Sequence, residues 1–463
     1  MSKELYKIDK NVIIFKADNE IEFEKLFFSE TFNNFICQSI SNGIITEIKF
    51  YSMNLNLLSK FNIPSNGIKK IECHYYTVNV NNPYFDTTYE FNNLPESLEE
   101  LNLLFFGKLK IKNLLNLPPN LKIVKLGKSI SNILLDNLPN KLEHFEISTD
   151  GTVSFEYLPS SLLYLKIIFE EESNVSLDSL PSSLETLIIV GKYTGQLNNL
   201  PFGLKKLYVP NNYDWTIFNL PTSITELMIN LKYTKLLDLF DNANKFKYNL
   251  KILKIGYQYN QHSSLTSNFN LESIPSTVEE LEFGDEFNQE LKYLPKNLKK
   301  LIFGFNFKYP IGQNVLPDTI EHLVFGYNFN NRITRYPDNL KYLKFGRNYS
   351  QRLDNLPAKL IHLVINERFH EKIQNLPPSL RILEFDDLAE FNEELELPDS
   401  LEILILGKYF RSRKLKNIPN GLKKIKISNS CGLVITKLLE HNYAGEIMYY
   451  PENKNKIQND EKN

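Results

Sequence analysis

The chain has 463 residues, of which 42% are hydrophobic, and its formal net charge is −2. This hydrophobic content supports a packed interior and excludes a globally disordered chain. The near-neutral charge lacks the basic excess with which proteins bind phosphate backbones, so we expect no nucleic-acid partner. No apolar run approaches the roughly 20 residues that cross a bilayer, so we expect no membrane partner either.

Two features predict a cytoplasmic location. The N-terminal residues lack the long apolar core of a signal peptide, and the apolar run at residues 12–15 is too short to supply one. The three cysteines, Cys37, Cys73 and Cys431, are odd in number and far apart. That usage is typical of buried or idle thiols in a reducing compartment.

Residues 1–40 precede the repeats. Within them, residues 19–28 are compatible with one acidic helix, and no proline occurs before Pro64. Because a stack of repeats needs a cover for its first unit, we predict that residues 1–40 form an N-terminal capping segment.

One pattern recurs from residue 41 onward, and its most regular feature is a proline every 20 to 22 residues. With the proline as position 0, apolar residues stand at +3, +6, +8, +12, +16 and +19, as in Leu340, Leu343 and Phe345 after Pro337. One unit, at residues 247–256, lacks the proline. The prolines in this register are Pro95, Pro118, Pro139, Pro159, Pro181, Pro201, Pro221, Pro275, Pro295, Pro317, Pro337, Pro357, Pro377, Pro398 and Pro419.

Each repeat predicts one short strand and one return segment. Positions +6 and +8 alternate with charged neighbours, which indicates a strand with one buried face. A glycine often follows at +9, where we expect it to let the chain turn sharply. The remaining ten or so residues are too few for a helix before the next proline, so we predict that they are extended.

A single coil of this kind cannot bury its own apolar face, so neighbouring coils must stack. The predicted fold is therefore a β solenoid, a curved stack of 20–22-residue coils over residues 41–427, with a parallel β-sheet on the inner face. Residues 428–450 contain an apolar segment that is predicted to cap the last coil. Residues 451–463 are almost wholly polar and are predicted to be a disordered tail.

The pattern Leu-Pro-x-x-Leu-x-x-Leu-x-Phe-Gly-x-x-Phe-Asn closely resembles the FNIP repeat, a relative of the leucine-rich repeat. Residues 281–288 and 323–330 are instances, and the resemblance covers roughly residues 41–427. It implies a leucine-rich-repeat-like solenoid, and a source in amoebae or in the giant viruses that infect them. For a viral protein, the compartment would be the host-cell cytoplasm.

Some members of this family resemble F-box proteins at the N-terminus, which would make the repeats a substrate receptor of a ubiquitin ligase. Residues 1–40 lack the Leu-Pro pair that would open such a segment. Leucine-rich repeats also carry an asparagine at what is here +11. Because only some coils keep it (Asn212, Asn306, Asn328, Asn348), while Glu286, Arg368 or Tyr409 stands there in others, we expect no continuous asparagine ladder.

The outward strand positions +4, +5 and +7 carry charges that alternate in sign between coils. At +4, nine neighbouring pairs are both charged and all are opposite in sign; +5 and +7 add five more such pairs. Facing opposite charges on adjacent strands stabilise a sheet and like charges destabilise it, so we predict that these residues fix the register of the coils. The +4 residues are Glu99, Lys122, Glu143, Leu163, Glu185, Lys205, Thr225, Lys251, Glu279, Lys299, Glu321, Lys341, Ile361, Arg381, Glu402 and Lys423.

The alternating charges are replaced by apolar residues in two places, here called the first and second lapse. Ile188, Tyr208 and Met228 occupy +7 in three consecutive coils, with Tyr164 nearby at +5 and Trp215 in a return segment. Apolar residues on a charged face can mark a protein-binding site, although aromatic and β-branched residues also simply suit strands. The second lapse comprises Ile382, Ile403 and Ile405.

No motif for catalysis or cofactor binding is complete. Gly127-Lys128-Ser129 lacks the earlier glycine of a phosphate loop, and His370-Glu371 lacks the second histidine of a zinc-protease helix. We therefore expect no enzyme activity, no cofactor, no metal and no small-molecule substrate. The predicted function is a protein–protein interaction scaffold. The alternatives are a ubiquitin-ligase substrate receptor with a degenerate N-terminal adaptor segment and a structural spacer without a specific partner.

Overall fold

The structure is a computed structural model. It describes residues 6–16, 30–51, 66–75, 88–89, 94–105, 110–111, 114, 116–130, 133, 135–210, 213, 217, 220–229, 247–256, 270–386, 389, 391, 393–407, 410, 415–427, 434, 436, 438, 440 and 443–450. The chain forms two compact units, Met1–Leu239 and Phe240–Asn463, here called unit 1 and unit 2.

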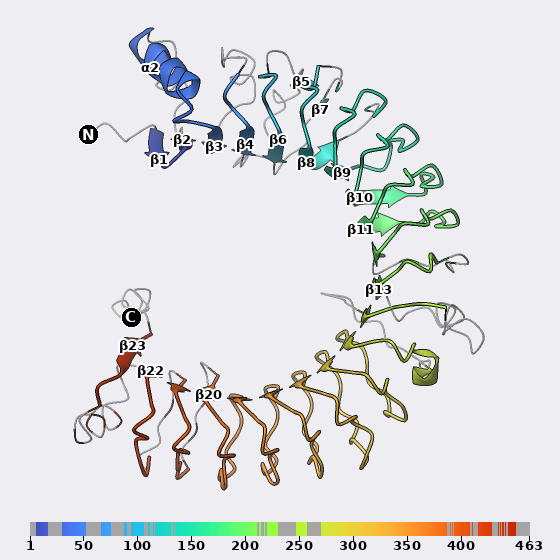
Figure 1. The fold of residues 1–463 in the computed structure, drawn as a ribbon. Coiled ribbons are helices and arrows are strands. Elements are labelled where there is room, and N and C mark those ends of the chain that lie inside the picture. The colour runs from blue at the N-terminus through green and yellow to red at the C-terminus, as the bar shows by residue number, and fades with distance from the viewer. Residues whose placement is uncertain are drawn as a thin grey trace, which may run out of the picture. The chain divides into compact units, whose positions relative to one another are not determined.

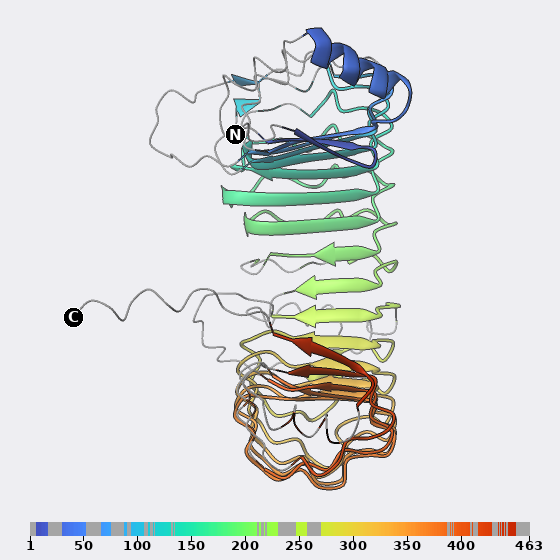
Figure 2. The same cartoon turned by 90° about the vertical axis from the view of Figure 1, so that its left-hand side faces the viewer.

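Unit 1 is a stack of strands joined by irregular return segments (Figures 1 and 2). β1 pairs with β2 in the antiparallel sense, and the pairs from β2 to β13 that follow are parallel. β5 (Thr88–Tyr89) and β7 (Lys110–Ile111) form a separate two-stranded pair. The main strands are β1 (Tyr6–Asp9), β2 (Val12–Lys16), β3 (Glu47–Tyr51), β4 (Lys70–Tyr75), β6 (Glu100–Phe105), β8 (Ile123–Ile130), β9 (His144–Thr149), β10 (Tyr164–Ser173), β11 (Thr186–Tyr193), β12 (Lys206–Tyr208) and β13 (Glu226–Ile229).

Unit 2 repeats the arrangement with shorter strands, all paired in parallel from β14 to β23. In each unit taken alone, the strands line the concave side of the arc and the return segments its convex side (Figure 1). The strands are β14 (Ile252–Ile255), β15 (Glu280–Phe283), β16 (Lys300–Ile302), β17 (His322–Val324), β18 (Tyr342–Lys344), β19 (His362–Ile365), β20 (Ile382–Phe385), β21 (Ile403–Ile405), β22 (Lys424–Ile427) and β23 (Glu446–Tyr449). The predicted β solenoid with a parallel inner sheet is confirmed.

Helical structure is scarce among the described residues. The α-helix α2 (Glu30–Ser41) lies at the N-terminal end of unit 1 (Figure 2), and a single 3₁₀ turn, η2 (Leu271–Ser273), interrupts the return segments. Val434, Thr436, Leu438 and Glu440, the described residues of the stretch 434–440, are helical, and Val434 and Leu438 are buried. The acidic helix predicted at residues 19–28 lies outside the described residues, as does the tail at residues 451–463.

Each coil begins with the same turn, which explains the recurring proline. The carbonyl oxygen of Pro337 accepts the backbone N–H of Leu340 at 3.2 Å, and the other anchor prolines in the described coils repeat this bond. Two N–H groups, of Lys341 and Tyr342, then donate to the carbonyl oxygen of Glu321 in the preceding coil, at 2.8 and 3.0 Å. The proline opens the turn at a position where no N–H donor is needed.

Side chains at +2 add a second link between coils. Ser379 Oγ donates to the carbonyl oxygen of Leu360 at 2.7 Å, and Thr319 Oγ1 donates to that of Leu298 at 2.8 Å. The acceptor is in each case the buried +3 residue of the coil before. These bonds satisfy carbonyl groups that the sheet itself leaves without a donor.

The predicted anchor residues form the core. Leu340, Leu343 and Tyr349 are fully buried, and Phe345 is nearly so. In unit 2 the aromatic residues at +8 and +12 stack on their equivalents in the next coil; the ring centroids of Phe303 and Phe325, for example, are 5.5 Å apart. The +12 stack is Phe287, Phe307, Phe329, Tyr349, Phe369 and Phe410, with Phe391, at +14 of its coil, stacked between the last two.

The +9 glycines have a different role from the predicted one. Gly256 has a positive φ of 77°, as a turn glycine would, but Gly304, Gly326 and Gly346 do not. Instead, a Cβ added at Gly326 would overlap the carbonyl oxygen of Gly304, and one at Gly346 would overlap that of Gly326. These positions require glycine because the backbones of consecutive coils touch there.

The asparagine column at +11 is local, as predicted. Asn328 Nδ2 donates to Asn306 Oδ1 at 3.2 Å, and Asn348 Nδ2 donates to Asn328 Oδ1 at 3.0 Å. Asn212 and Tyr409 lie outside the described residues. The bonds therefore link three consecutive coils of unit 2.

Both ends of the repeat array continue the sheet. β2, which lies within residues 1–40, pairs in parallel with β3, and its Ile13 and Phe15 are fully buried. β23, within residues 428–450, pairs in parallel with β22. The capping roles assigned to these two segments, and their boundaries, stay predictions.

We predict that truncating a core anchor is far more costly than truncating its charged neighbour. Leu343→Ala should lower the free energy of unfolding by about 2–5 kcal/mol because it leaves a cavity, whereas Lys341→Ala should lower it by less than about 1 kcal/mol. Chemical denaturation of both variants measures the difference. Equal effects would contradict the strand register described above.

Candidate protein-binding surface

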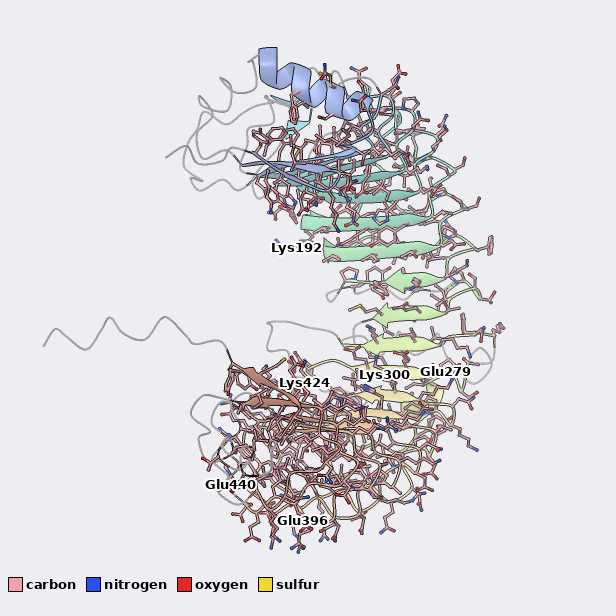
Figure 3. All side chains as sticks on the ribbon, turned by 60° about the vertical axis from the view of Figure 1, so that its left-hand side comes forward. Lys192, Glu279, Lys300, Glu396, Lys424 and Glu440 are labelled. Carbon is pink, nitrogen blue, oxygen red and sulfur yellow. The ribbon has the colours of Figure 1, made fainter. Side chains whose placement is uncertain are left out.

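The alternating charges at +4 form a ladder of ion pairs along the sheet. Seven of the nine predicted pairs have N···O distances within 4.0 Å, from 2.6 Å for Lys205–Glu185 and Lys299–Glu279 to 3.1 Å for Lys122–Glu99 and Arg381–Glu402. Several carboxylates lie between two cations: Glu279 pairs with Lys251 and Lys299, and Glu402 with Arg381 and Lys423. We call this +4 column the charge ladder; Figure 3 labels Glu279 within it.

All five predicted pairs at +5 and +7 are also present, with distances from 2.8 to 3.6 Å. The structure adds pairs towards the two ends that sequence reasoning missed, among them Lys49–Glu72 and Lys424–Glu446. They were missed because at least one strand of each pair lies outside the regular proline register. Their partners face each other directly across adjacent strands.

Hydrogen bonds from lysines lower the pKa of three ladder carboxylates, Glu99, Glu279 and Glu402. Hydrogen bonds from Lys251 and Lys299 lower the pKa of Glu279 to about 2. A lowered pKa means that the ionised form supports the fold at neutral pH and that this support is lost as the pH falls from about 4.5 towards 2. These side chains are largely exposed to solvent, so each pair contributes little to overall stability and mainly favours one register.

We predict that one isolated ladder pair shows the preference for opposite over like charges at facing +4 positions. Glu185 and Lys205 are flanked at +4 by the uncharged Leu163 and Thr225. Glu185→Lys and Lys205→Glu should each lower the free energy of unfolding by about 0.2–1 kcal/mol, since each creates a like-charge pair. The double variant, which restores opposite charges, should recover most of the loss at low salt. Losses that simply add in the double variant would show that the two side chains do not interact.

The first lapse in the charges forms a continuous apolar patch on unit 1. Ile188, Tyr208 and Met228 are direct neighbours across β11, β12 and β13, and Lys166 faces Ile188 from β10. Tyr164 lies on β10 as well, one outward position before Lys166. We call Tyr164, Ile188, Tyr208 and Met228 the apolar patch; all four are half-buried, and Trp215 lies outside the described residues.

Polar contacts hold the two tyrosines of the patch in place. The Tyr208 hydroxyl donates to the Glu226 carboxylate, which also pairs with Lys206 at 3.0 Å. The ring of Tyr164 stacks on that of His144, with 4.0 Å between centroids, and His144 is hydrogen-bonded to Glu146 at 2.8 Å. Burial raises the pKa of Tyr164, so the phenol is neutral at physiological pH. The patch therefore presents ordered aromatic rings.

Two more residues extend the patch. Ile168 and Val190 face each other across β10 and β11, at the next outward position after Lys166 and Ile188. Val190 is 41% exposed, which places apolar surface in contact with solvent. Sequence reasoning missed both because the repeat pattern predicts outward strand positions only as far as +7. In these longer strands the period-2 alternation continues to +9.

The second lapse lies on unit 2 and is less continuous. Ile382 and Ile403 are direct neighbours across β20 and β21, but Ile405 faces Glu384. Glu384 in turn is 3.3 Å from His362 Nε2. Charged and imidazole groups thus interrupt the isoleucines, which do not form a stripe of the kind seen on unit 1.

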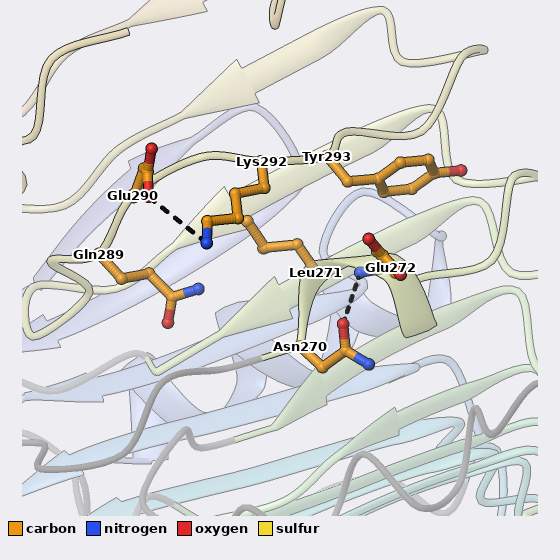
Figure 4. Close-up of a pocket in the computed structure, with 7 residues that line it drawn as sticks. All are labelled: Asn270, Leu271, Glu272, Gln289, Glu290, Lys292 and Tyr293. Atoms are coloured by element: carbon orange, nitrogen blue, oxygen red, sulfur yellow. Dashed lines mark hydrogen bonds and ion pairs between the residues drawn. The ribbon is translucent and has the colours of Figure 1, made fainter. Parts of the chain in front are cut away.

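A small cavity of about 160 Å³ lies between two consecutive return segments of unit 2 (Figure 4). Its walls include Leu271 and Tyr293, together with an ion pair of 3.7 Å between Lys292 and Glu290. Drug-sized ligands occupy roughly 300–1,000 Å³, so this space is too small to hold one. It gives no support to a small-molecule site.

The described part of the chain contains no group of three or more His, Cys, Asp or Glu residues placed to hold a metal ion. Within the same residues, no helix has the length and apolar character needed to cross a bilayer. Cys73 is buried and reduced, and burial raises its pKa, which disfavours the thiolate.

Sequence comparison identifies repeats in the middle of the chain. The FNIP repeat matches residues 267–306, 287–328 and 307–336. No curated protein matches the sequence. The matched residues include the stacked Phe303 and Phe325 and the glycines Gly304 and Gly326.

Structural comparison shows the fold. CroV588, a protein of the giant virus CroV described as a novel circular leucine-rich-repeat structure, superposes with a TM-score of 0.60 and 24% identity, over 92% of this chain and 70% of that one. YopM from Yersinia enterocolitica WA-314 gives a TM-score of 0.46 and 20% identity, over 89% of this chain and 91% of that one. The likeness to CroV588 establishes a leucine-rich-repeat-like solenoid.

Proposed function

We propose that this leucine-rich-repeat-like solenoid, which carries FNIP repeats, is a non-enzymatic scaffold that binds a partner protein through the apolar patch on unit 1. One observation carries the proposal: Ile188, Tyr208 and Met228 form an in-register apolar stripe that directly follows the paired charges Lys125, Glu146 and Lys166 at the same position of the preceding coils. Soluble proteins tolerate exposed apolar surface in small patches, and larger continuous ones mark interaction sites.

The composition of the patch suits a protein partner. Tyrosine is enriched among residues that dominate binding energy, and methionine adapts to irregular partner surfaces. Lys166, Lys206 and Glu226 border the stripe and supply a polar rim of both signs. Both lysines are ion-paired, Lys166 with Glu146 and Lys206 with Glu226, so the long-range field of the rim is weak. This favours contact recognition over attraction of nucleic acid or of a charged membrane.

The location and the source of the protein are proposed from its sequence. A cytoplasmic location follows from the cysteine usage, and a source in amoebae or giant viruses from the FNIP resemblance. The ligase-receptor alternative depends on residues 1–40, of which β1 and β2 pair into the sheet of the solenoid. That placement favours the scaffold over a separate adaptor segment.

We predict that the patch can be altered without unfolding the protein. The triple variant Ile188→Ser, Tyr208→Ser and Met228→Ser should keep a melting temperature close to that of the wild type, because the three side chains are only half-buried and Glu226 keeps its ion pair with Lys206. Its affinity for the main partner, identified by crosslinking mass spectrometry, should fall at least about tenfold.

The matched control uses the +4 column of the same three coils, with Glu185, Lys205 and Thr225 changed to Ser. These substitutions should leave partner binding unchanged. Retained folding with unchanged binding in the patch variant would contradict the proposal. A large fall in melting temperature would show that the patch residues are core.

A further inference from the structure

A second surface lies on unit 2, at the edge of the sheet where the strands end. The residues at +10 in five consecutive coils are Asp285, Phe305, Tyr327, Arg347 and Glu367. The Phe305 and Tyr327 rings stack with 4.3 Å between centroids and 18° between planes. The Arg347 guanidinium lies 5.4 Å from the Tyr327 centroid. We call this set the planar column.

At one end of the column, a carboxylate neutralises the charge of Arg347. Arg347 is bound by Glu367, with 2.5 Å from Nε to Oε2 and a hydrogen bond of 2.8 Å from Nη2 to Oε1. Tyr327 thus has an aromatic ring on one face and a guanidinium on the other, and that guanidinium has its own carboxylate. Cation–π stacking and a two-point ion pair act on the same planar group.

The spacing of the column comes from the touching glycines at +9. Gly304, Gly326 and Gly346 directly precede Phe305, Tyr327 and Arg347, and a Cβ at any of the three would overlap backbone of the coil before. Because these backbones touch, the side chains that follow stand at stacking distance. The column is therefore rigid at its base.

The column ends on the other side at Phe305 and Asp285. Phe305 is 44% exposed, and within the described residues its aromatic contact is with Tyr327 on one face. The opposite face lies toward the preceding coil, where Asp285 Oδ1 accepts the Phe305 backbone N–H at 3.0 Å. Asp285 and the adjacent Glu286 form no ion pair with any residue that the structure describes. The exposed Phe305 ring thus adjoins the Asp285 carboxylate, which has no cationic partner among the described residues.

We propose that the exposed Phe305 ring, with Asp285, binds an arginine side chain presented by a partner protein. The bound guanidinium would lie over the part of the Phe305 ring that extends beyond the shorter Asp285 side chain, and would pair with the Asp285 carboxylate. Tyr327, Arg347 and Glu367 show the same combination of ring, guanidinium and carboxylate within the chain, although there the guanidinium belongs to a coil of its own. A planar, bidentate guanidinium matches both elements, whereas the ammonium of lysine offers only a point charge.

The surrounding charge favours a basic occupant. Residues 271–292 contain seven carboxylates and a single lysine, and Glu279, Glu280 and Glu282 are already paired with lysines of neighbouring coils. The carboxylates left over at Asp285 and Glu286 repel phosphate groups, which disfavours nucleic acid and anionic lipid. This site lies on unit 2 and does not depend on the apolar patch.

The test uses the full chain and a defined probe, a fluorescein-labelled, capped peptide of alternating Gly and Arg with three arginines. A peptide with Lys in place of Arg is the matched control. Fluorescence anisotropy at low salt should show the arginine peptide binding more tightly than the lysine peptide, by roughly two- to fivefold, the value of an exposed cation–π contact. Phe305→Ala and Phe305→Leu should both remove this difference.

Asp285→Asn removes the charge but keeps the oxygen that accepts the Phe305 N–H, and it should weaken arginine-peptide binding. Phe202→Ala, which alters a 94% exposed phenylalanine of unit 1, should change nothing. Melting temperatures of all variants should match the wild type. Failure of the arginine peptide to bind, equal binding of the two peptides, or binding that is insensitive to Phe305→Ala would overturn the proposal. None of these results would affect the apolar patch.

Discussion

Direct contact between the backbones of consecutive coils is the constraint on which the rest of the structure depends. A coil of about 20 residues has too little interior to bury its leucines, so it must lie against the next coil. In unit 2 the +9 glycines show this constraint, because a Cβ at Gly326 would overlap the carbonyl oxygen of Gly304. The same spacing sets the stacking of Phe303 on Phe325 and the bonds from Asn328 to Asn306.

The regular spacing also explains the surface. Equivalent residues of consecutive coils face each other, so like charges would repeat their repulsion along the whole stack. The charge ladder avoids this by alternation, and Glu279 accepts from both Lys251 and Lys299. Such a face has little net field. We propose that a partner gains binding energy where the pairing stops, at the apolar patch of unit 1 and at the Phe305 end of the planar column of unit 2.

Sequence alone predicted much of this fold because the constraint is periodic. Burial of Leu340 and Leu343, and the pairing of Lys205 with Glu185, follow from position in the repeat. Sequence reasoning misread the glycines because their steric role depends on the distance between coils, which one repeat does not reveal. It also did not assign the strands β2 and β23, since Val12–Lys16 and Glu446–Tyr449 lack the Pro-x-x-Leu turn.

The two candidate sites also differ in how far the sequence could predict them. Ile188, Tyr208 and Met228 could be predicted as neighbours because they share one position in consecutive coils. The planar column could not, because Phe305, Tyr327 and Arg347 differ in chemistry and become one feature only when their stacking is seen. The repeats therefore predict contacts between similar residues at equivalent positions, whereas contacts between chemically unlike residues require the structure.

The most direct measurement of the central claim is the free energy of unfolding of Gly326→Ala compared with Gly203→Ala, by chemical denaturation. A methyl group at Gly326 would overlap the backbone of the preceding coil, whereas one at Gly203 would lie 3.4 Å from the Ser182 carbonyl oxygen, an ordinary contact. Backbone contact between coils predicts a loss of roughly 1–3 kcal/mol or more for Gly326→Ala. It predicts little loss, or a gain of up to about 1 kcal/mol, for Gly203→Ala. If Gly326→Ala were as stable as the wild type, the coils would not touch at their glycines, and the account of their stacking would be wrong.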